Sequence, residues 1–254
     1  MRCWYSCPIC QNIYNNKEEY VFESSFTNEE ITKKECPKGH SFIIYNLSDK
    51  YRTIFDEAIM QLQDGFYNNA VLNAYTSLEE FMKFYIKFKM YIAGKDIKSI
   101  FNFIESISQS ENKKGAFMLC YFDDFNSILS KNEFNKFSTL RNKIIHDCKF
   151  IEFEEAYKYC ENIYIFINKI INRIYKKYSS DDFFNFEYLI TKYYNSQIEE
   201  LDEYKVIGNI NILPPIGENG NDNFKEAYET FKIIREITYT NYNNNSVEVI
   251  EGEE

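Results

Sequence analysis

The sequence FEEAYKYCENIYIFINKIINRI at residues 153–174 has the clearest periodicity in the chain. Its apolar and aromatic side chains recur in alternating steps of four and three, as on one face of an α-helix: Phe153, Tyr157, Cys160, Tyr164, Ile167, Ile171 and Ile174. Such a stripe has to be covered by another helix, either of the same chain or of a second copy. This stretch therefore predicts a long amphipathic helix within a mainly α-helical fold.

A second long helix is predicted upstream, at residues 66–89. Its buried stripe consists of Ala70, Ala74, Leu78, Phe81, Tyr85 and Phe88. The two alanines are small enough to let a neighbouring helix cross closely. The shorter elements predicted between residues 48 and 152 are a helix at 51–60 after a Ser48 N-cap, a helix at 97–107, a polar loop at 108–115, a helix around 117–122, and a helix with Phe134, Phe137, Leu140 and Ile144 inward.

The sequence LRNKIIHD at residues 140–147 concentrates side chains that can act on a phosphate group. In a helix, Asn142 and His146 are four residues apart on one face, and the long side chain of Arg141 can reach the same point. A guanidinium binds two phosphate oxygens as a fork, an amide donates a further hydrogen bond, and an imidazole transfers protons near neutral pH. The alternative is a histidine that caps the helix end beside a surface Arg–Asp pair.

Three carboxylates are auxiliary candidates for this site. Asp147 directly follows the histidine, and Glu79 and Glu80 lie within the apolar run of the upstream helix. The two glutamates either face solvent or reach toward Arg141. The local charge balance around the motif is basic, with Lys131, Lys136, Arg141, Lys143 and Lys149 against Glu133 and Asp147. A phosphate-attracting patch and a solvated helix face are both compatible with this balance.

The N-terminal region contains two pairs of soft metal ligands. Cys7 and Cys10 form the first pair, and Cys36 and His40 form the second, about twenty-five residues later. Each pair belongs to a turn with Pro or Gly, as a closed tetrahedral zinc site requires, and the flanking strands are expected to form a ribbon. Cys3 is an alternative ligand. The pattern predicts one structural Zn²⁺ per chain, which contributes folding free energy and no catalysis.

Composition and charge restrict the class of protein. The 254 residues include 18% aromatic side chains, which disordered chains lack. With no signal-peptide pattern and no apolar run of about eighteen residues, we expect a cytoplasmic protein without a membrane partner. In that compartment the seven cysteines are thiols or metal ligands.

The net charge of −10 is concentrated in the last third of the chain. Residues 179–254 carry 16 acidic and 5 basic side chains, whereas residues 1–178 carry 23 and 24. This acidic region either covers the basic patch or docks a protein regulator or trigger. It is predicted to contain a helix at 181–203, an extended piece at 206–213, a helix at 224–237 and a disordered tail at 241–254.

Together, the sequence NAYTSLEEF at residues 73–81, the Arg141-Asn142-x-x-x-His146 motif, and Glu154-Glu155-Ala156-Tyr157 before the long helix resemble the HEPN domain family. The resemblance covers residues 48–177. It implies a helical domain that dimerises and, in active members, cleaves RNA without a metal. The expected division is a zinc-ribbon-like module at 1–46, a HEPN-like helical bundle at 47–178 and the mixed, acidic C-terminal region at 179–254.

This resemblance implies a metal-independent endoribonuclease that leaves 2′,3′-cyclic phosphate ends. Arg141 and Asn142 are then expected to hold the scissile phosphate, and His146 to move the proton. Because the chain has only two histidines and His40 is assigned to zinc, a homodimer with a composite active site is expected. The family suggests a bacterial toxin or anti-phage defence effector. The alternative is a catalytically inactive dimerisation module, or one that binds a nucleotide or nucleic acid, with the zinc ribbon as an interaction surface.

Overall fold

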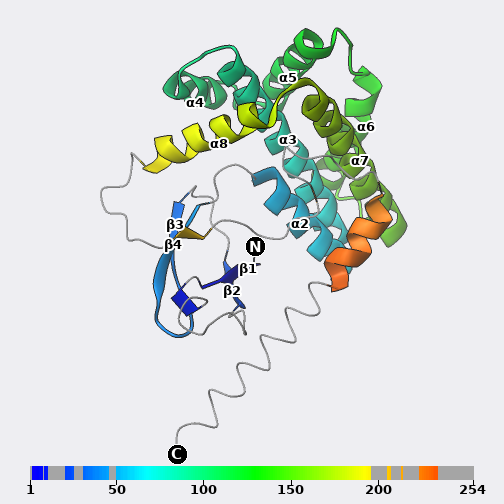
Figure 1. Cartoon of the computed structure of the whole chain (residues 1–254). Helices are drawn as coiled ribbons and strands as arrows, with labels where there is room; N and C mark the ends of the chain where they lie inside the picture. The colour runs from blue at the N-terminus through cyan, green and yellow to red at the C-terminus, as the bar shows by residue number, and fades with distance from the viewer. Residues whose placement is uncertain are drawn as a thin grey trace, which may run out of the picture.

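The chain is mainly α-helical, as predicted (Figure 1). This computed structural model describes residues 2–7, 9–10, 21–25, 31–45, 50–195, 205–206, 213 and 223–233. Its helices are α2 (Lys50–Gln63), α3 (Tyr67–Ile92), α4 (Ile97–Ser106), α5 (Ser110–Phe125), α6 (Lys131–His146), α7 (Phe153–Lys177), α8 (Ser180–Asn195) and a further helix at 224–233. None of the helices in this part of the chain is both long and apolar enough to cross a bilayer.

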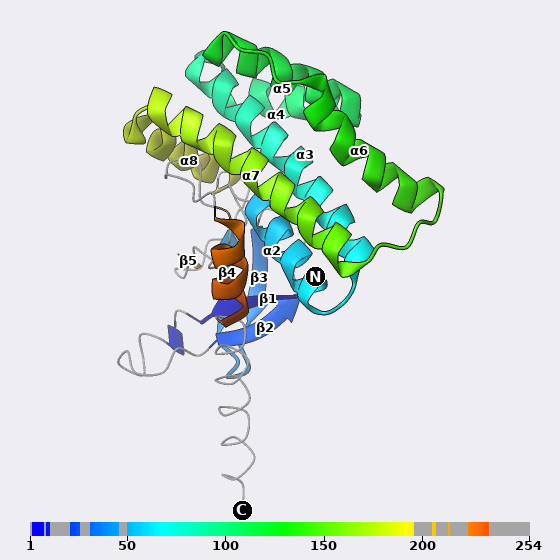
Figure 2. The same cartoon turned by 90° about the vertical axis from the view of Figure 1, so that its right-hand side faces the viewer.

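Helix α3 lies in the middle of the bundle, with α2, α5 and α7 packed around it (Figures 1 and 2). The predicted stripe of α3 is confirmed, because every one of its members is fully buried: Ala70, Ala74, Leu78, Phe81, Tyr85 and Phe88. The close crossing of α2 and α3 brings the Ser77 hydroxyl to the Tyr51 carbonyl, to which it donates a hydrogen bond of 2.6 Å. Small side chains therefore set the spacing of these two helices.

Helix α7 covers the other side of α3, and most of its predicted stripe is buried. Cys160, Tyr164, Ile167, Ile171 and Ile174 are all at most 1% exposed. The stripe is less buried at its N-terminal end, where Phe153 is 36% exposed. The sequence pattern does not say whether the helix that covers this stripe comes from the same chain or from a second copy. In the structure, the covering helix is α3 of the same chain.

The predicted polar loop at residues 108–115 is wrong, because α5 already begins at Ser110. Its polar first turns face α3 and make specific bonds there. The Ser110 hydroxyl donates to Glu79 at 2.5 Å, and the Lys113 ammonium contacts the same carboxylate at 3.1 Å. Polar side chains that are paired in this way can begin a helix as well as a loop.

The other helices lie where they are predicted, and they differ from the predictions only in where they begin or end. Helix α4 matches the predicted 97–107 closely, and the Asp96 carboxylate caps it by accepting from the Ser99 N–H at 2.9 Å. Helix α8 is described as far as Asn195. Ser48, most of the extended piece at 206–213 and the tail at 241–254 lie outside the described residues.

Two small β-structures surround the N-terminal cysteines. Strand β1 (Arg2–Ser6) pairs antiparallel with β2 (Val21–Ser25), and β3 (Ile31–Glu35) pairs antiparallel with β4 (Ser41–Tyr45). Strand β5 (Lys205–Val206) adds to β4 in parallel, so a segment from the C-terminal third joins the N-terminal sheet.

The C-terminal third also contributes to the helical core. Phe183, Phe186 and Ile190 of α8 are buried, and the Phe183 ring stacks on Phe88 with centroids 4.9 Å apart. Phe224 is likewise buried, in the helix at 224–233 that Figure 1 shows beside α2 and α7. One hydrophobic core therefore continues across residue 178.

Candidate functional site

Cys7, Cys10, Cys36 and His40 come together at one point of the N-terminal region. Their ligand atoms all lie within 4.8 Å of one another. The Cys10 and Cys36 sulfurs are 3.9 Å apart, and His40 Nδ1 is 3.2 Å from the Cys10 sulfur and 3.6 Å from the Cys36 sulfur. Bonds of about 2.3 Å to a tetrahedral ion place two sulfurs roughly 3.8 Å apart. The spacing therefore fits a metal ion at the centre of the four atoms.

The local backbone explains how the four side chains converge. The β3–β4 hairpin turns through residues 36–40, where Gly39 has a φ of 81° that side chains disfavour. In the first pair, the Cys10 N–H points at the Cys7 sulfur at 3.4 Å. The three thiols are buried, with His40 at the edge. These four residues can bind a metal ion.

The electrostatics of the cluster favour a cation. Burial raises the pKa of the Cys10 thiol to about 12, and the neighbouring Cys7 adds to this effect. Gathered thiolates are therefore stable only where a positive charge is present. Cys3, the alternative ligand, lies in β1 with its backbone opposite Ser24, and its side chain is outside the described part.

The second candidate site is the C-terminal end of α6. Arg141, Asn142 and His146 all belong to this helix, and His146 is its last residue. The Arg141 Nη1 donates a hydrogen bond of 3.0 Å to the Asn142 side-chain oxygen. Asn142 and His146 are exposed, while Arg141 is half-buried. A cation and an amide are thus joined on the helix that also carries the imidazole, one turn further on.

Arg141 packs over the ring of Tyr75 on α3, a residue outside the predicted site. The guanidinium carbon lies 5.8 Å from the centre of the Tyr75 ring. The Tyr75 hydroxyl lies 3.3 Å from the Ser110 hydroxyl, which in turn donates to Glu79. Burial raises the pKa of Tyr75, so this phenol is neutral at physiological pH. Tyr75 and Glu79 share one face of α3, but no local pattern in the sequence links them to Arg141.

The three auxiliary carboxylates have different environments. Glu79 is engaged by Ser110 and Lys113, and it approaches Arg141 only through Tyr75. Glu80 forms an ion pair with Lys83 on the same helix. Asp147 is exposed immediately after α6. Both glutamates are therefore partly exposed and held by ion pairs at the surface of the bundle.

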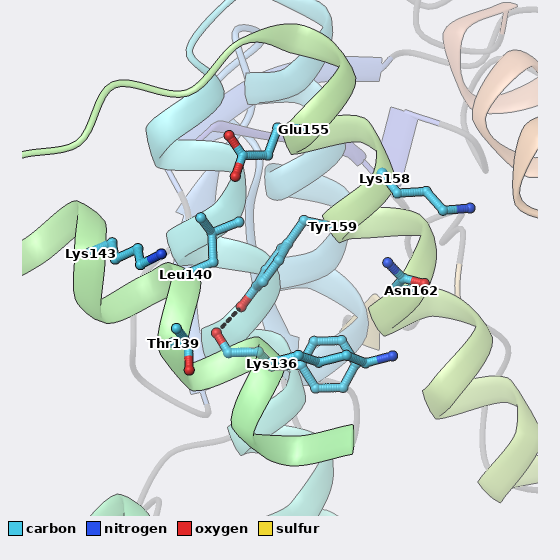
Figure 3. Close-up of a pocket in the computed structure, with 9 residues that line it drawn as sticks. Lys136, Thr139, Leu140, Lys143, Glu155, Lys158, Tyr159 and Asn162 are labelled. Carbon is cyan, nitrogen blue, oxygen red and sulfur yellow. Dashed lines mark hydrogen bonds between the residues drawn. The ribbon is translucent and has the colours of Figure 1, made fainter. Parts of the chain in front are cut away.

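A groove of about 490 Å³ separates α6 from the first half of α7, next to the motif (Figure 3). One wall belongs to α6 and the other to α7, and only the α6 wall contains residues of the predicted basic patch. Tyr159 forms its floor and donates a hydrogen bond of 2.9 Å from its hydroxyl to the Phe137 carbonyl. The residues that line it are Lys136, Phe137, Thr139, Leu140, Lys143, Glu155, Lys158, Tyr159 and Asn162.

The predicted basic patch corresponds in part to this groove. Lys136 and Lys143 line it, while Lys149 forms an ion pair with Glu155 at 2.6 Å. The side chains of Lys131 and Glu133 are outside the described part. The lysines that remain beside α6 give this side of the bundle a local positive charge.

The chain was compared with protein families, with curated proteins and with solved structures. No family, no curated protein and no solved structure matches it.

Proposed function

We propose that this protein is a metal-independent endoribonuclease of the HEPN type. The observation that carries the proposal is the arrangement on α6, where the Arg141 guanidinium bonds to Asn142 and an exposed His146 follows on the next turn. These are the groups that a phosphodiester cleavage needs, and they are accessible to a polymer. The helical fold around them agrees with the resemblance at residues 48–177.

The reaction proposed is attack by the RNA's own 2′-hydroxyl. A base removes the 2′-hydroxyl proton, the 2′-oxygen bonds to phosphorus, and the bond from phosphorus to the 5′-oxygen breaks as an acid protonates that oxygen. The products are a 2′,3′-cyclic phosphate and a 5′-hydroxyl. Arg141 stabilises the additional negative charge of the pentacoordinate phosphorus, and Asn142 orients its oxygens.

A second proton carrier is required, and a homodimer supplies it best. His40 belongs to the metal cluster, and the ion pairs of Glu79 and Glu80 hold those carboxylates in place. Two α6 segments facing each other across a two-fold axis would bring together two imidazoles and two guanidiniums. Asp147, exposed beside His146, is the alternative within one chain.

The Cys7, Cys10, Cys36 and His40 cluster is proposed to hold a structural Zn²⁺. Three sulfurs and one ring nitrogen at tetrahedral spacing suit this ion, and four protein ligands leave no coordination position for water. Zinc would therefore stabilise the ribbon and take no part in RNA cleavage.

The biological setting that follows from the family resemblance is a cytoplasmic toxin or anti-phage defence effector that destroys RNA. One observation favours the alternative of an inactive dimerisation or nucleic-acid-binding module. Arg141 is already held by Asn142 and Tyr75, as a purely structural arginine would be.

Incubation of the purified protein with total RNA distinguishes the active ribonuclease from the inactive binding module. The wild-type chain should degrade RNA, and His146→Ala should lose at least a hundredfold of the rate, because a positioned acid or base typically contributes 10²–10⁴-fold. Lys98→Ala on α4, an exposed lysine outside the candidate site, serves as the control and should keep full activity. Equal activity of the wild-type and His146→Ala proteins would exclude the proposed mechanism.

A further inference from the structure

The groove between α6 and α7 combines an apolar floor with a positively charged wall on α6. Phe137, Leu140 and Tyr159 supply the apolar surface, and Figure 3 shows Leu140 and Tyr159 between the two helices. Lys136 and Lys143 extend from α6. In the described part of the chain, neither lysine has a carboxylate within ion-pair distance.

The opposite wall of the groove is neutral on balance, because its charged side chains are paired, and the positive charge of the groove comes from Lys136 and Lys143. Lys158 projects from α7, where it pairs with Glu161 along the helix surface. Glu155 is the acidic side chain of the lining, and the Lys149 ammonium neutralises it with contacts of 2.6 and 2.8 Å. A net positive groove remains, which attracts an anionic chain.

An exposed aromatic ring lies in the loop that joins α6 to α7, the two helices that form this groove. Phe150 is 89% exposed, although the backbone on both sides of it is fixed. The Asn68 side chain donates to the Lys149 carbonyl at 2.9 Å and accepts from the Ile151 N–H at 3.0 Å. Ile151 itself is buried. The loop therefore presents the Phe150 ring to solvent in a defined position.

The groove, the ring and the motif are connected along the chain. The Lys149 N–H donates to the Lys143 carbonyl at 3.2 Å, and its ammonium contacts Glu155, so the residue directly before Phe150 contacts two residues of the groove wall. His146 lies between Lys143 and Lys149 in the chain, at the end of α6. The imidazole therefore belongs to the segment of chain that joins the groove wall on α6 to Phe150.

We infer that the groove binds single-stranded RNA, with phosphates at Lys136, Lys143 and Lys158 and an unpaired base stacked on Phe150. The assignment of the strand as a substrate rests on the proposed function, whereas the binding itself does not. Lysines along a groove follow a phosphate backbone, and an exposed aromatic ring stacks on any base. A duplex fits less well, because its bases are stacked on each other and cannot reach Phe150.

Fluorescence anisotropy of the full-length His146→Ala protein with a labelled twelve-nucleotide single-stranded RNA tests the inference. Lys136→Glu with Lys143→Glu should weaken binding at least tenfold at 50 mM salt and lower the salt dependence by about 1.4 in logarithmic slope, since each lost phosphate contact removes about 0.7. Phe150→Ala should weaken binding about tenfold, and Phe150→Trp should retain it.

The control carries the same charge change elsewhere, as Lys98→Glu with Lys176→Glu, two exposed lysines of α4 and the far end of α7. It should bind RNA within threefold of the parent. Equal weakening by the control and the groove variant would overturn the inference, as would a duplex that binds tighter than the single strand. Cleavage by the wild-type chain is scored separately, so RNA binding without cleavage would reject the ribonuclease and leave the groove assignment intact.

Discussion

At the scale of single residues, the carboxylate of Asp124 joins three helices. It is fully buried, and it accepts hydrogen bonds from Lys89 at 2.5 Å, Lys177 at 2.6 Å, Tyr178 at 2.5 Å and also Tyr85. These donors come from α3, from the end of α7 and from the residue after it. Asp124 therefore fixes the end of the bundle at which α5 and α7 terminate.

The pKa of Asp124 is lowered in the folded protein. Burial alone would raise this pKa, but the hydrogen bonds from Lys177, Lys89 and the two tyrosines outweigh it. A carboxylate with a depressed pKa stabilises the fold above its ordinary pKa of about 4. That contribution is lost as the pH falls through the lower pKa of the folded state.

We expect Asp124→Asn to lower the free energy of unfolding by about 3 kcal/mol at pH 7, the low end of the range for a broken buried ion pair because Lys177 is partly exposed. Urea denaturation measures this change. The difference from wild type should shrink below pH 4, where the wild-type carboxylate becomes protonated.

The neighbouring Asp123 provides the control, because it pairs with the same Lys89 but is 71% exposed. Asp123→Asn should cost less than about 1 kcal/mol. Equal effects of the two substitutions would contradict the role given to Asp124.

Sequence reasoning could identify side chains of the candidate site but not what supports them. The helical spacing brought Asn142 and His146 to one exposed end of α6. The contact between Arg141 and Tyr75 joins residues far apart in the chain, and no local pattern contains it. The same holds for Asn68, which fixes the loop around Phe150 from another helix.

At the scale of elements, hydrophobic periodicity predicts where the helices lie. It fails where the first turns of a helix are polar, as in α5. The stripes of α3 and α7 are predictable from the sequence because nearly all of their side chains are buried on one face of the helix, with Phe153 as the exposed exception. The start of α5 was missed because Ser110 and Lys113 are polar, although the partner that accepts both, Glu79, lies on α3. The bonds to Glu79 on another helix therefore determine that this polar segment is helical.

The N-terminal element should contain one zinc ion per chain, because three thiols and an imidazole converge at tetrahedral spacing. Elemental analysis of protein purified without added metal measures the content. Cys36→Ser should lose the ion and unfold the ribbon, since structural zinc contributes on the order of 10 kcal/mol in small modules.

Cys148→Ser is the matched control, because Cys148 is exposed and outside the cluster. It should keep the full zinc content. Less than about one-tenth equivalent of zinc in the soluble wild-type protein would refute the metal assignment.

Helix α8 should behave as part of the core, because Phe186 is fully buried and contacts Phe84 and Phe88 at centroid distances of 5.5 and 5.4 Å. Phe186→Ala is expected to lower the free energy of unfolding by about 3–5 kcal/mol. Thermal or urea denaturation measures the loss. Phe184→Ala, two residues earlier and 70% exposed, should change stability by less than about 0.5 kcal/mol. Similar losses from both variants would show that α8 does not pack as described.

At the scale of the whole molecule, the acidic C-terminal third is expected to cover the basic patch or to dock a regulator. Its buried residues, among them Phe183, Phe186, Leu213 and Phe224, also complete the common core, and β5 joins the N-terminal sheet. Net charge describes the surface of these residues and not their packing. A deletion from residue 179 would therefore remove part of the core along with the acidic side chains.

The proposed composite active site needs a histidine from each of two chains. A mixed dimer tests this requirement. Differently tagged wild-type and His146→Ala chains are co-expressed, and the dimer with one chain of each kind is isolated. Because one imidazole would have to serve as both acid and base, its rate should fall far below half of the wild-type rate. A rate of one half, or an active monomer at concentrations where no dimer forms, would show that each chain works alone.

The most direct test of the account is the end chemistry of the RNA products. A defined single-stranded RNA is incubated with the protein after free divalent ions have been chelated, under conditions in which the zinc content stays at one per chain. The account predicts 2′,3′-cyclic phosphate and 5′-hydroxyl ends with the wild-type chain, and intact RNA with His146→Ala. Intact RNA in both samples, cleavage by both proteins, or products with 3′-hydroxyl and 5′-phosphate ends would contradict it.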